Sequence, residues 1–318
     1  MGKPKIACYW AASCGGCDVS ILDIGSRLAD LAEKVELVFW PIALDFKYKD
    51  VEAMPDGNID ICLFNGAIRS SENEEIAKLL RRKSKILIAY GACAYLGGIP
   101  GLANLTTLKE ILSRVYKETP STVNPENVIP QPEVEVKEGP LRLPTLYEEV
   151  KPLSAVVEVD YAIPGCPPIG EKAWEALLKL IEGERPPKGS VLAAGERTVC
   201  DTCPRKKEDK RIKGMKRIFQ VVPDPEKCFL EQGIMCMGPA TREGCDAQCI
   251  KAGLPCKGCF GPAPNAEDQG ARILSALASI VEVNSEEEAK KFAESVADPA
   301  GTFYLFSLPS SLLKRRLK

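Results

Sequence analysis

The cysteines constrain this chain more than any other feature of its sequence. Twelve of the fourteen cysteines fall into three groups, and the densest group places Cys245, Cys249, Cys256 and Cys259 within fifteen residues. Four thiols at such close spacing are the ligands that a soft metal centre requires, either a zinc ion or an iron–sulfur cluster. We therefore expect this part of the chain to be held by metal centres rather than by a normal apolar core.

The chain contains no histidine. This absence excludes zinc sites with mixed cysteine and histidine ligands, catalytic zinc held by three histidines, and haem bound through histidine. It also excludes Ser-His-Asp triads and Cys-His nucleophilic pairs. The chemistry of the chain must therefore depend on its sulfur atoms.

Length and charge set broad limits on the protein. A chain of 318 residues can bury a full core and is long enough for two domains. Its formal net charge of −2 gives no reason to expect nucleic-acid binding or attraction to a membrane. The first residues lack the apolar run of a secretion signal and no segment reaches transmembrane length, so we expect a cytoplasmic protein. In a reducing compartment, closely spaced cysteines favour metal binding over disulfides.

The first half of the sequence alternates short apolar segments with amphipathic ones. This alternation is typical of βαβ units, in which helices cover both faces of a parallel sheet. The predicted strands are Lys5–Trp10, Val35–Trp40, Ile59–Asn65, Lys85–Tyr90 and Ala155–Asp160, and the predicted helices are Val19–Lys34, Glu72–Lys83, Thr106–Lys117 and Glu171–Ile181. We therefore predict an α/β domain with a parallel sheet.

Two segments rich in proline divide the chain. Residues 120–152 contain seven prolines and are predicted to form a loop-like excursion that covers the sheet as a flap. Residues 183–189 contain two prolines and two glycines, and they mark a boundary between a domain of residues 1–185 and a domain of residues 186–318. Hydrophobic periodicity fades in the second domain, so we predict a mostly irregular structure with two helices, Ala266–Ile280 and Ser285–Val296.

The first cysteine group lies in loops that follow predicted strands. Cys14 and Cys17 form a C-x-x-C motif directly after the first strand, and Cys93 and Cys166 follow the fourth and fifth strands. Open α/β sheets bind their ligands at the carboxyl ends of the strands, so we expect these four thiols at one edge of the sheet. A C-x-x-C motif alone also occurs in thioredoxin-like redox pairs, but the recurrence of this position favours a metal centre.

The other eight cysteines form two further groups. Cys200 and Cys203 are followed by Cys228 and Cys236, and then by the dense group that begins at Cys245. Two sites with four thiolates each are the economical arrangement, but the sequence leaves open how Cys236 and Cys245 are divided between them. Structural zinc is an alternative, although zinc normally pairs two C-x-x-C motifs and the uneven spacing here fits that arrangement poorly.

The three groups together resemble the small subunit of [NiFe] hydrogenases. The resemblance spans nearly the whole chain and is carried by Cys14-x-x-Cys17, Gly91-Ala92-Cys93-Ala94, Pro164-Gly165-Cys166-Pro167-Pro168 and the segment Cys228…Cys236-Met237-Gly238-Pro239…Cys245…Cys256-Lys257-Gly258-Cys259. It implies a flavodoxin-like parallel sheet domain, followed by a C-terminal, mostly irregular iron–sulfur domain. It also implies three [4Fe–4S] clusters as cofactors.

The resemblance implies which cysteines hold each cluster. The proximal cluster would take Cys14, Cys17, Cys93 and Cys166, the medial cluster Cys245, Cys249, Cys256 and Cys259, and the distal cluster Cys200, Cys203, Cys228 and Cys236. The chain departs from the common family pattern at Cys200, which stands in place of a histidine, and at Cys249, which adds a fourth thiolate to a site that often has three. The thiolate at Cys200 adds negative charge, which is expected to lower the potential of the distal cluster.

The resemblance also implies a function without a catalytic residue in this chain. The chain would carry electrons from H2 oxidation at a large subunit, which holds the Ni–Fe centre, to a flavin- or heterodisulfide-reductase-type acceptor. It is most similar to the small subunits of the cytoplasmic F420-non-reducing (viologen-reducing) hydrogenases of methanogenesis, whose implied partners include a small ferredoxin-like or delta subunit and heterodisulfide reductase. The alternatives are the gamma subunit of an F420-reducing hydrogenase, a single-cluster subunit of a complex I-like enzyme, and a zinc-held scaffold protein.

Three further residues receive no ligand role from the sequence. Cys8 and Cys62 each lie inside a strand-like run, where a buried free cysteine is the expected state. Asp60 also lies in such a run, and the sequence leaves open whether it approaches the proximal cluster.

Overall fold

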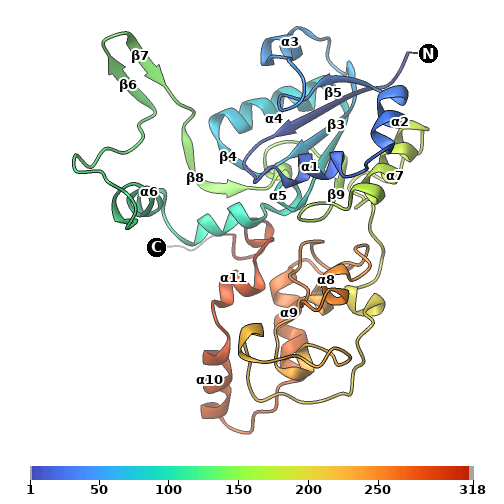
Figure 1. Ribbon diagram of the computed structural model, residues 1–318, viewed down its shortest axis with the longest axis vertical. Helices are drawn as coiled ribbons and strands as arrows, with labels where there is room; N and C mark the ends of the chain where they lie inside the picture. The colour runs from blue at the N-terminus through green and yellow to red at the C-terminus, as the bar shows by residue number, and fades with distance from the viewer. Residues whose placement is uncertain (1, 315–318) are drawn as a thin grey trace.

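The N-terminal half of the chain forms a five-stranded parallel sheet in the computed structural model, which describes residues 2–314 (Figure 1). The strands are β1 (Lys5–Trp10), β2 (Glu36–Phe39), β3 (Ile59–Asn65), β5 (Ser84–Tyr90) and β9 (Tyr161–Ile163). Their order is β2-β1-β3-β5-β9, and every neighbouring pair is parallel. This is the doubly wound order of flavodoxin-like folds, so the predicted fold class is confirmed.

Helices cover both faces of the sheet, and each face buries its own apolar core. One face carries α1 (Gly16–Leu22), α2 (Arg27–Lys34) and α7 (Gly170–Ile181), and the other carries α3 (Tyr48–Ala53), α4 (Ser71–Lys83) and α5 (Ala92–Leu96). Because successive strand residues point to opposite faces, the three inner strands β1, β3 and β5 contribute to both cores. Cys8 and Cys62 are buried on opposite faces of the sheet, and Cys8 belongs to the same apolar core as Cys17.

Two predicted elements differ from the observed ones. The run Ala155–Asp160 is not a strand, and the fifth strand begins only at Tyr161. The valines of this run contact the core without pairing in the sheet, so their apolar character reflects burial alone. The predicted helix Val19–Lys34 is two helices, because the chain turns between them at Gly25, whose φ of 61° is readily adopted only by glycine.

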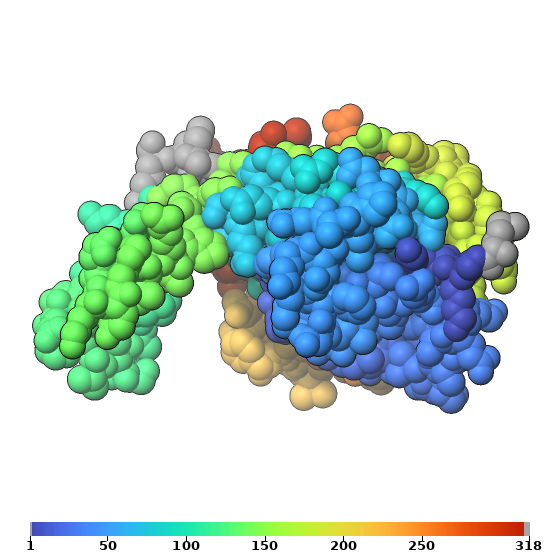
Figure 2. Space-filling model, turned by 90° about the horizontal axis from the view of Figure 1, so that it is seen from above, coloured from blue at the N-terminus to red at the C-terminus, as the bar shows by residue number. Residues whose placement is uncertain are grey.

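Residues 106–145 form an arm that extends away from the sheet, as Figures 1 and 2 show. The predicted excursion is therefore confirmed, but it does not cover the sheet as a flap and it contains regular elements. The arm begins with α6 (Leu108–Ser113), where the Thr107 side chain caps the helix by accepting a hydrogen bond from the Glu110 N–H. It continues into a hairpin of β6 (Glu133–Val136) and β7 (Gly139–Arg142) and returns to the body through β8 (Leu146–Lys151), which pairs with β4 (Ile68–Ser70).

The C-terminal half is mostly irregular, as predicted, but it has an apolar core of its own. It contains α8 (Gln248–Lys251), α9 (Gln269–Ala278), α10 (Glu286–Ser295) and α11 (Pro299–Phe303), of which α9 and α10 correspond to the two predicted helices. Ile273 and Leu277 of α9 are buried in one cluster with Phe229, so the expectation that metal centres replace a core was wrong. Within residues 2–314, no helix combines the length and the hydropathy needed to cross a bilayer.

The chain continues along the first sheet for a few residues beyond the predicted domain boundary. The Ala162 N–H donates to the Ser190 carbonyl at 3.2 Å, and the Leu192 N–H donates to the Ala162 carbonyl at 2.8 Å. Residues 189–192 therefore extend the edge of the sheet next to β9. The division into residues 1–185 and 186–318 stays a prediction.

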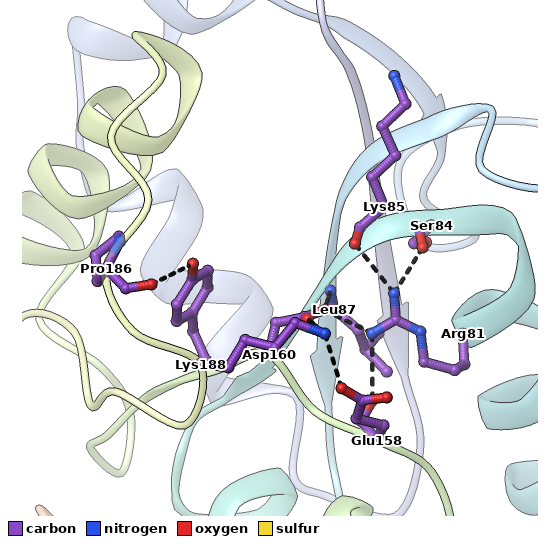
Figure 3. Close-up of polar contacts among 9 residues, drawn as sticks. Arg81, Ser84, Lys85, Leu87, Glu158, Asp160, Pro186 and Lys188 are labelled. Carbon is purple, nitrogen blue, oxygen red and sulfur yellow. Dashed lines mark hydrogen bonds and ion pairs between the residues drawn. The ribbon is translucent and has the colours of Figure 1, made fainter.

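The buried carboxylate of Asp160, the residue directly before β9, joins three segments of the chain (Figure 3). Asp160 Oδ2 accepts hydrogen bonds from the Leu87 N–H at 2.8 Å and from Arg81 at 2.6 Å, and Lys188 Nζ lies 3.2 Å from Oδ1. Burial alone would raise the pKa of Asp160, but the hydrogen bonds from Arg81 and Leu87 outweigh burial and lower this pKa. The carboxylate thus ties α4, β5 and the segment after α7 together.

Replacing Asp160 with asparagine is expected to lower the free energy of unfolding by about 2–3 kcal/mol, because Arg81 loses a buried anionic partner. The folded-state pKa is lowered, so this stabilisation is present above the unfolded-state pKa of about 3.9 and is lost as the pH falls through the folded-state pKa. Urea unfolding from about pH 7 to about pH 3 should show the difference between the two proteins shrinking at the acid end.

Asp56→Asn is a matched control for this prediction. The Asp56 side chain is 69 % exposed and pairs with Lys83 at 2.9 Å, so its loss should cost under about 1 kcal/mol. Equal losses in the two variants would contradict the special role of the buried carboxylate.

Candidate metal centres

The structure brings the first cysteine group together at the carboxyl ends of the strands. Cys14 and Cys17 lie at the start of α1 after β1, Cys93 lies at the start of α5 after β5, and Cys166 follows β9. Burial is the largest cause that raises the pKa of Cys17 and Cys93, and the neighbouring thiols of the group raise it further. The pKa of Cys93 reaches about 12. Such thiols stay protonated at neutral pH unless a metal replaces the proton.

Two glycines let the backbone pack directly against these thiols. A Cβ atom at Gly91 would lie 2.3 Å from Cys17 Sγ, and a Cβ atom at Gly98 would lie 2.5 Å from Cys93 Sγ. The Gly91 N–H donates to the Ile163 carbonyl at 2.8 Å, which fixes this backbone against β9. The thiols of Cys17 and Cys93 therefore lie against bare backbone, and any larger side chain at these two glycines would displace them.

A buried polar network fixes the loop that leads to Cys17. The Asp18 carboxylate is 2 % exposed and accepts hydrogen bonds from Trp40 Nε1 at 2.9 Å and from the Asn65 side-chain amide. Asn65 Oδ1 in turn accepts a hydrogen bond from Ser13 Oγ at 3.1 Å. This network was not predicted from the sequence, where its one visible signal was an acidic residue directly after a predicted ligand.

Asp60, whose place the sequence left open, lies away from the first group. Its carboxylate accepts hydrogen bonds from the Lys5 N–H at 2.7 Å and from Lys85 Nζ at 2.6 Å. These partners lie at the amino ends of β1 and β5, which is the edge of the sheet opposite to the cysteines.

Four cysteines line a cavity of about 390 Å³ in the C-terminal half, which we call the distal cavity. These are Cys200, Cys203, Cys228 and Cys236, so the structure places Cys236 beside Cys200. Burial is the largest cause that raises the pKa of Cys200 to about 12 and that of Cys236 to about 11. The nearby ammonium of Lys207 opposes part of this rise at Cys200.

The dense group forms the remaining site. Burial raises the pKa of Cys259 to about 12, and the thiols of Cys245 and Cys249 contribute to the rise. Burial is also the largest cause of the raised pKa of Cys256. The thiol of Cys236 is the next largest cause, and the thiol of Cys259 contributes as well. Cys245 is therefore placed with the dense group, and Cys256 lies at the side that adjoins the distal cavity.

The three groups adjoin one another in a row. The backbone of Cys166 lies near enough to Cys259 to lower the pKa of its thiol, so the first group adjoins the dense group. The thiol of Cys236 lies near enough to Cys256 to raise its pKa, so the dense group adjoins the distal cavity. The first group and the distal cavity are thus connected through the dense group.

Lys172 of α7 binds residues at the junction between the first group and the dense group. Its Nζ donates to the Gly244 carbonyl at 2.6 Å and lies 2.8 Å from Asp246 Oδ2. These two partners flank Cys245, so the contacts of Lys172 hold the dense group against the N-terminal domain.

The donor arrangement fits iron–sulfur clusters. Among residues 2–314, no three Cys, Asp or Glu side chains converge closely enough to share one metal ion, whereas zinc needs its thiolates about 2.3 Å from a single centre. Thiols that surround a space match a cluster in which each iron takes its own thiolate. The distal cavity, with four thiols in its wall and a volume of about 390 Å³, is such a space.

Comparisons with known proteins agree with this geometry. Residues 14–180 match the family described as NADH ubiquinone oxidoreductase, 20 Kd subunit. The chain is 42% identical over 323 residues to an iron–sulfur subunit of the F420-non-reducing hydrogenase of Archaeoglobus profundus, and the match covers 98% of each chain. It is 36% identical to a chain of an NAD+-reducing [NiFe]-hydrogenase crystallised in the H2-reduced state, with a TM-score of 0.50 and coverage of 58% of this chain and 94% of that chain.

A third comparison supports the fold alone. The match to a [NiFeSe]-hydrogenase chain from Dm. baculatum has 18% identity and a TM-score of 0.51, and it covers 82% of this chain and 95% of that chain. The likeness to the protein from Archaeoglobus profundus, by contrast, extends through the cysteine-rich C-terminal half. The chain therefore belongs to the small-subunit family of [NiFe] hydrogenases, in the group of the F420-non-reducing hydrogenase iron–sulfur subunits.

Proposed function

We propose that this chain carries electrons from H2 oxidation at a partner large subunit through three [4Fe–4S] clusters to a flavin- or heterodisulfide-reductase-type acceptor. The electron-transfer role within a [NiFe]-type hydrogenase follows from membership of the family. The observation that carries the three-cluster proposal is the row of thiol groups, joined through Cys166 and Cys259 and through Cys256 and Cys236. A relay requires redox centres in such close succession.

The protein's own residues would hold and tune the clusters, and none of them would be catalytic. When bound, iron–sulfur clusters supply one-electron redox chemistry at a potential set by burial, net charge and hydrogen bonds to sulfur. The chain provides buried thiols and a cradle of bare backbone beside Cys17 and Cys93. The proposed ligands are Cys14, Cys17, Cys93 and Cys166 for the proximal cluster, Cys245, Cys249, Cys256 and Cys259 for the medial cluster, and Cys200, Cys203, Cys228 and Cys236 for the distal cluster.

The surface beside Cys14 supports the proposal that a large subunit binds at this end of the row. Cys14 is exposed, and the Trp10 ring lies over Gly15 next to it. Trp10, Val19 and Leu22 are 41%, 54% and 47% exposed. Large apolar side chains that are exposed together are typical of protein interfaces. We therefore assign this face to the large subunit, and the distal end to a small ferredoxin-like or delta subunit that leads to heterodisulfide reductase.

Iron and acid-labile sulfide in anaerobically purified protein test the proposal. Three [4Fe–4S] clusters predict about twelve iron and about twelve sulfide per chain. About four of each would leave one cluster and favour a single-cluster subunit of the complex I-like type, while zinc without iron would favour a zinc-held scaffold. Reduction of F420 by the purified complex would favour the gamma subunit of an F420-reducing enzyme.

A further inference from the structure

The hairpin of the arm has one apolar face and one charged face. Val134 is paired with Leu141 across the two strands, and Glu133 is paired with Arg142. Directly paired residues lie on the same face of a hairpin, whereas successive residues lie on opposite faces. Glu133 and Arg142 accordingly form an ion pair of 3.2 Å on one face. The other face, which we call the apolar hairpin face, carries Val134, Val136, Leu141 and Leu143.

Nothing within residues 2–314 buries the apolar hairpin face. Val134 and Val136 are 42% and 37% exposed, and Leu141 and Leu143 are 59% and 57% exposed. An isolated two-stranded hairpin is only marginally stable in water, and it gains stability when its apolar face packs against another element. Large apolar side chains that are exposed together are typical of an interaction site. The hairpin therefore has the composition of one half of an interface.

The base of the arm is fixed to the body beside the first thiol group. Asn104 and Val150 lie on either side of the arm in the sequence and are both buried. The Val150 N–H donates to Asn104 Oδ1 at 2.8 Å, and Asn104 Nδ2 donates to the Val150 carbonyl at 3.0 Å. Val150 also packs in one apolar cluster with Cys93 and Ala67. The arm thus leaves the body at the edge of the sheet that carries the thiols.

This position places the arm beside one of the proposed partners. The first thiol group includes the exposed Cys14, next to the exposed Trp10, and this face is assigned to the large subunit. Figure 1 shows the arm beside the sheet domain, whereas α9 and α10 of the other half extend in a different direction. Figure 2 shows the arm standing apart from the body, with a hollow between them. A protein bound at the first thiol group would therefore be adjacent to the arm.

The chemistry of the arm favours a partner that stays bound. Residues 106–145 contain five cationic and six acidic side chains, so the arm carries no charge excess that would attract a nucleic acid or a membrane. Interfaces between permanent subunits are more apolar than the small contacts of transient electron carriers. The apolar hairpin face therefore matches a permanent subunit better than a soluble electron acceptor.

We propose that the arm of residues 106–145 clasps the large subunit, with the apolar hairpin face buried against apolar side chains of that subunit. This inference rests on the proposed function, because it takes the large subunit as the partner at the first thiol group. It adds a second contact region, separate from the surface around Cys14. No cysteine of the three groups lies in the arm, so loss of this contact should separate the subunits without loss of iron.

The double variant Val134→Lys/Leu141→Glu, produced together with the large subunit, tests the inference. Opposite charges at this cross-strand pair attract each other and preserve the hairpin. In the complex, however, the same charges would have to be buried in an apolar interface, which is costly. The fraction of this chain that elutes with the large subunit in size-exclusion chromatography should fall at least about tenfold, while the iron content of the chain stays at the wild-type value.

The matched control is Glu133→Arg/Arg142→Glu, which reverses an ion pair on the opposite face of the same hairpin. It should retain the large subunit as the wild type does. Leu143→Lys is the second variant, because it lies beyond the last residue of β7 and tests the same face if the double variant disturbs the hairpin. It should also lose the large subunit.

Retention of the large subunit by both the double variant and Leu143→Lys would overturn the inference. It would equally be overturned if these variants only converted a complex with two copies of this chain into one with a single copy, because the face would then bind a second copy. In both cases the wild-type protein would still contain about twelve irons. Failure of the proposed function would appear differently, as a wild-type chain with about four irons or without a bound large subunit.

Discussion

Replacing Cys228 with alanine is expected to remove the distal cluster and to lower the iron content from about twelve to about eight atoms per chain. Cys228 is one of the four thiols in the wall of the distal cavity, and no histidine exists in the chain to replace it. Loss of one thiolate also interrupts the end of the row of thiol groups. Electron transfer to a protein acceptor should therefore fall by more than the roughly 10–100-fold that loss of an outer-shell partner of a metal site costs.

Cys8→Ala is the control for this experiment. Cys8 is equally a thiol and is buried, but it lies inside β1 rather than in a loop at the carboxyl end of a strand. It should keep all of the iron and should lose only stability. Iron and sulfide analysis of both variants measures the difference, and a full iron content in Cys228→Ala would remove this residue from the ligand set.

Replacing Gly91 with alanine is expected to destabilise the N-terminal domain by about 3–4 kcal/mol and to prevent binding of the proximal cluster. Gly91 has a φ of 88° and a ψ of 163°, a combination that is essentially restricted to glycine. The new Cβ atom would lie 2.3 Å from Cys17 Sγ, so the thiol would have to move. The backbone cannot yield, because the Gly91 N–H is bonded to the Ile163 carbonyl of β9.

Gly139→Ala separates backbone strain from the clash with the thiol. Gly139 has a φ of 123°, but a Cβ atom there would have no neighbour within 4 Å. This variant should cost about 1–2 kcal/mol and keep all of its iron. Urea unfolding and iron analysis of the two variants should therefore diverge. If Gly91→Ala retained its iron, the cradle beside Cys17 would not be a cluster site.

The sheet domain could be predicted closely because its signals are local. Short apolar runs separated by amphipathic ones placed β1 and β3 at their observed bounds, and the strand order followed from the resemblance. The carboxyl ends of parallel strands share one edge, so the gathering of Cys14, Cys93 and Cys166 could be expected. The fifth strand was misplaced because a run of valines reports burial, whereas pairing in the sheet depends on a neighbouring strand.

The C-terminal half could be predicted less well, because its contacts are not local. The spacing of the cysteines indicated two groups but could not divide them, since Cys236 meets Cys200 only through the folding of the intervening loops. The apolar core around Phe229 was missed for the same reason, because most of its members lie in irregular segments with no helical or strand period.

Lys172 holds the two halves of the chain together where the first thiol group meets the dense group. Electron tunnelling weakens steeply as the gap between two centres widens. In the proposed relay, a small drift between the halves at this point would therefore slow electron transfer between the two groups, whereas bending of the arm of residues 106–145 would leave their separation unchanged. The contacts of Lys172 would thus keep the distance between the two thiol groups fixed, which is the distance that the proposed electron transfer depends on.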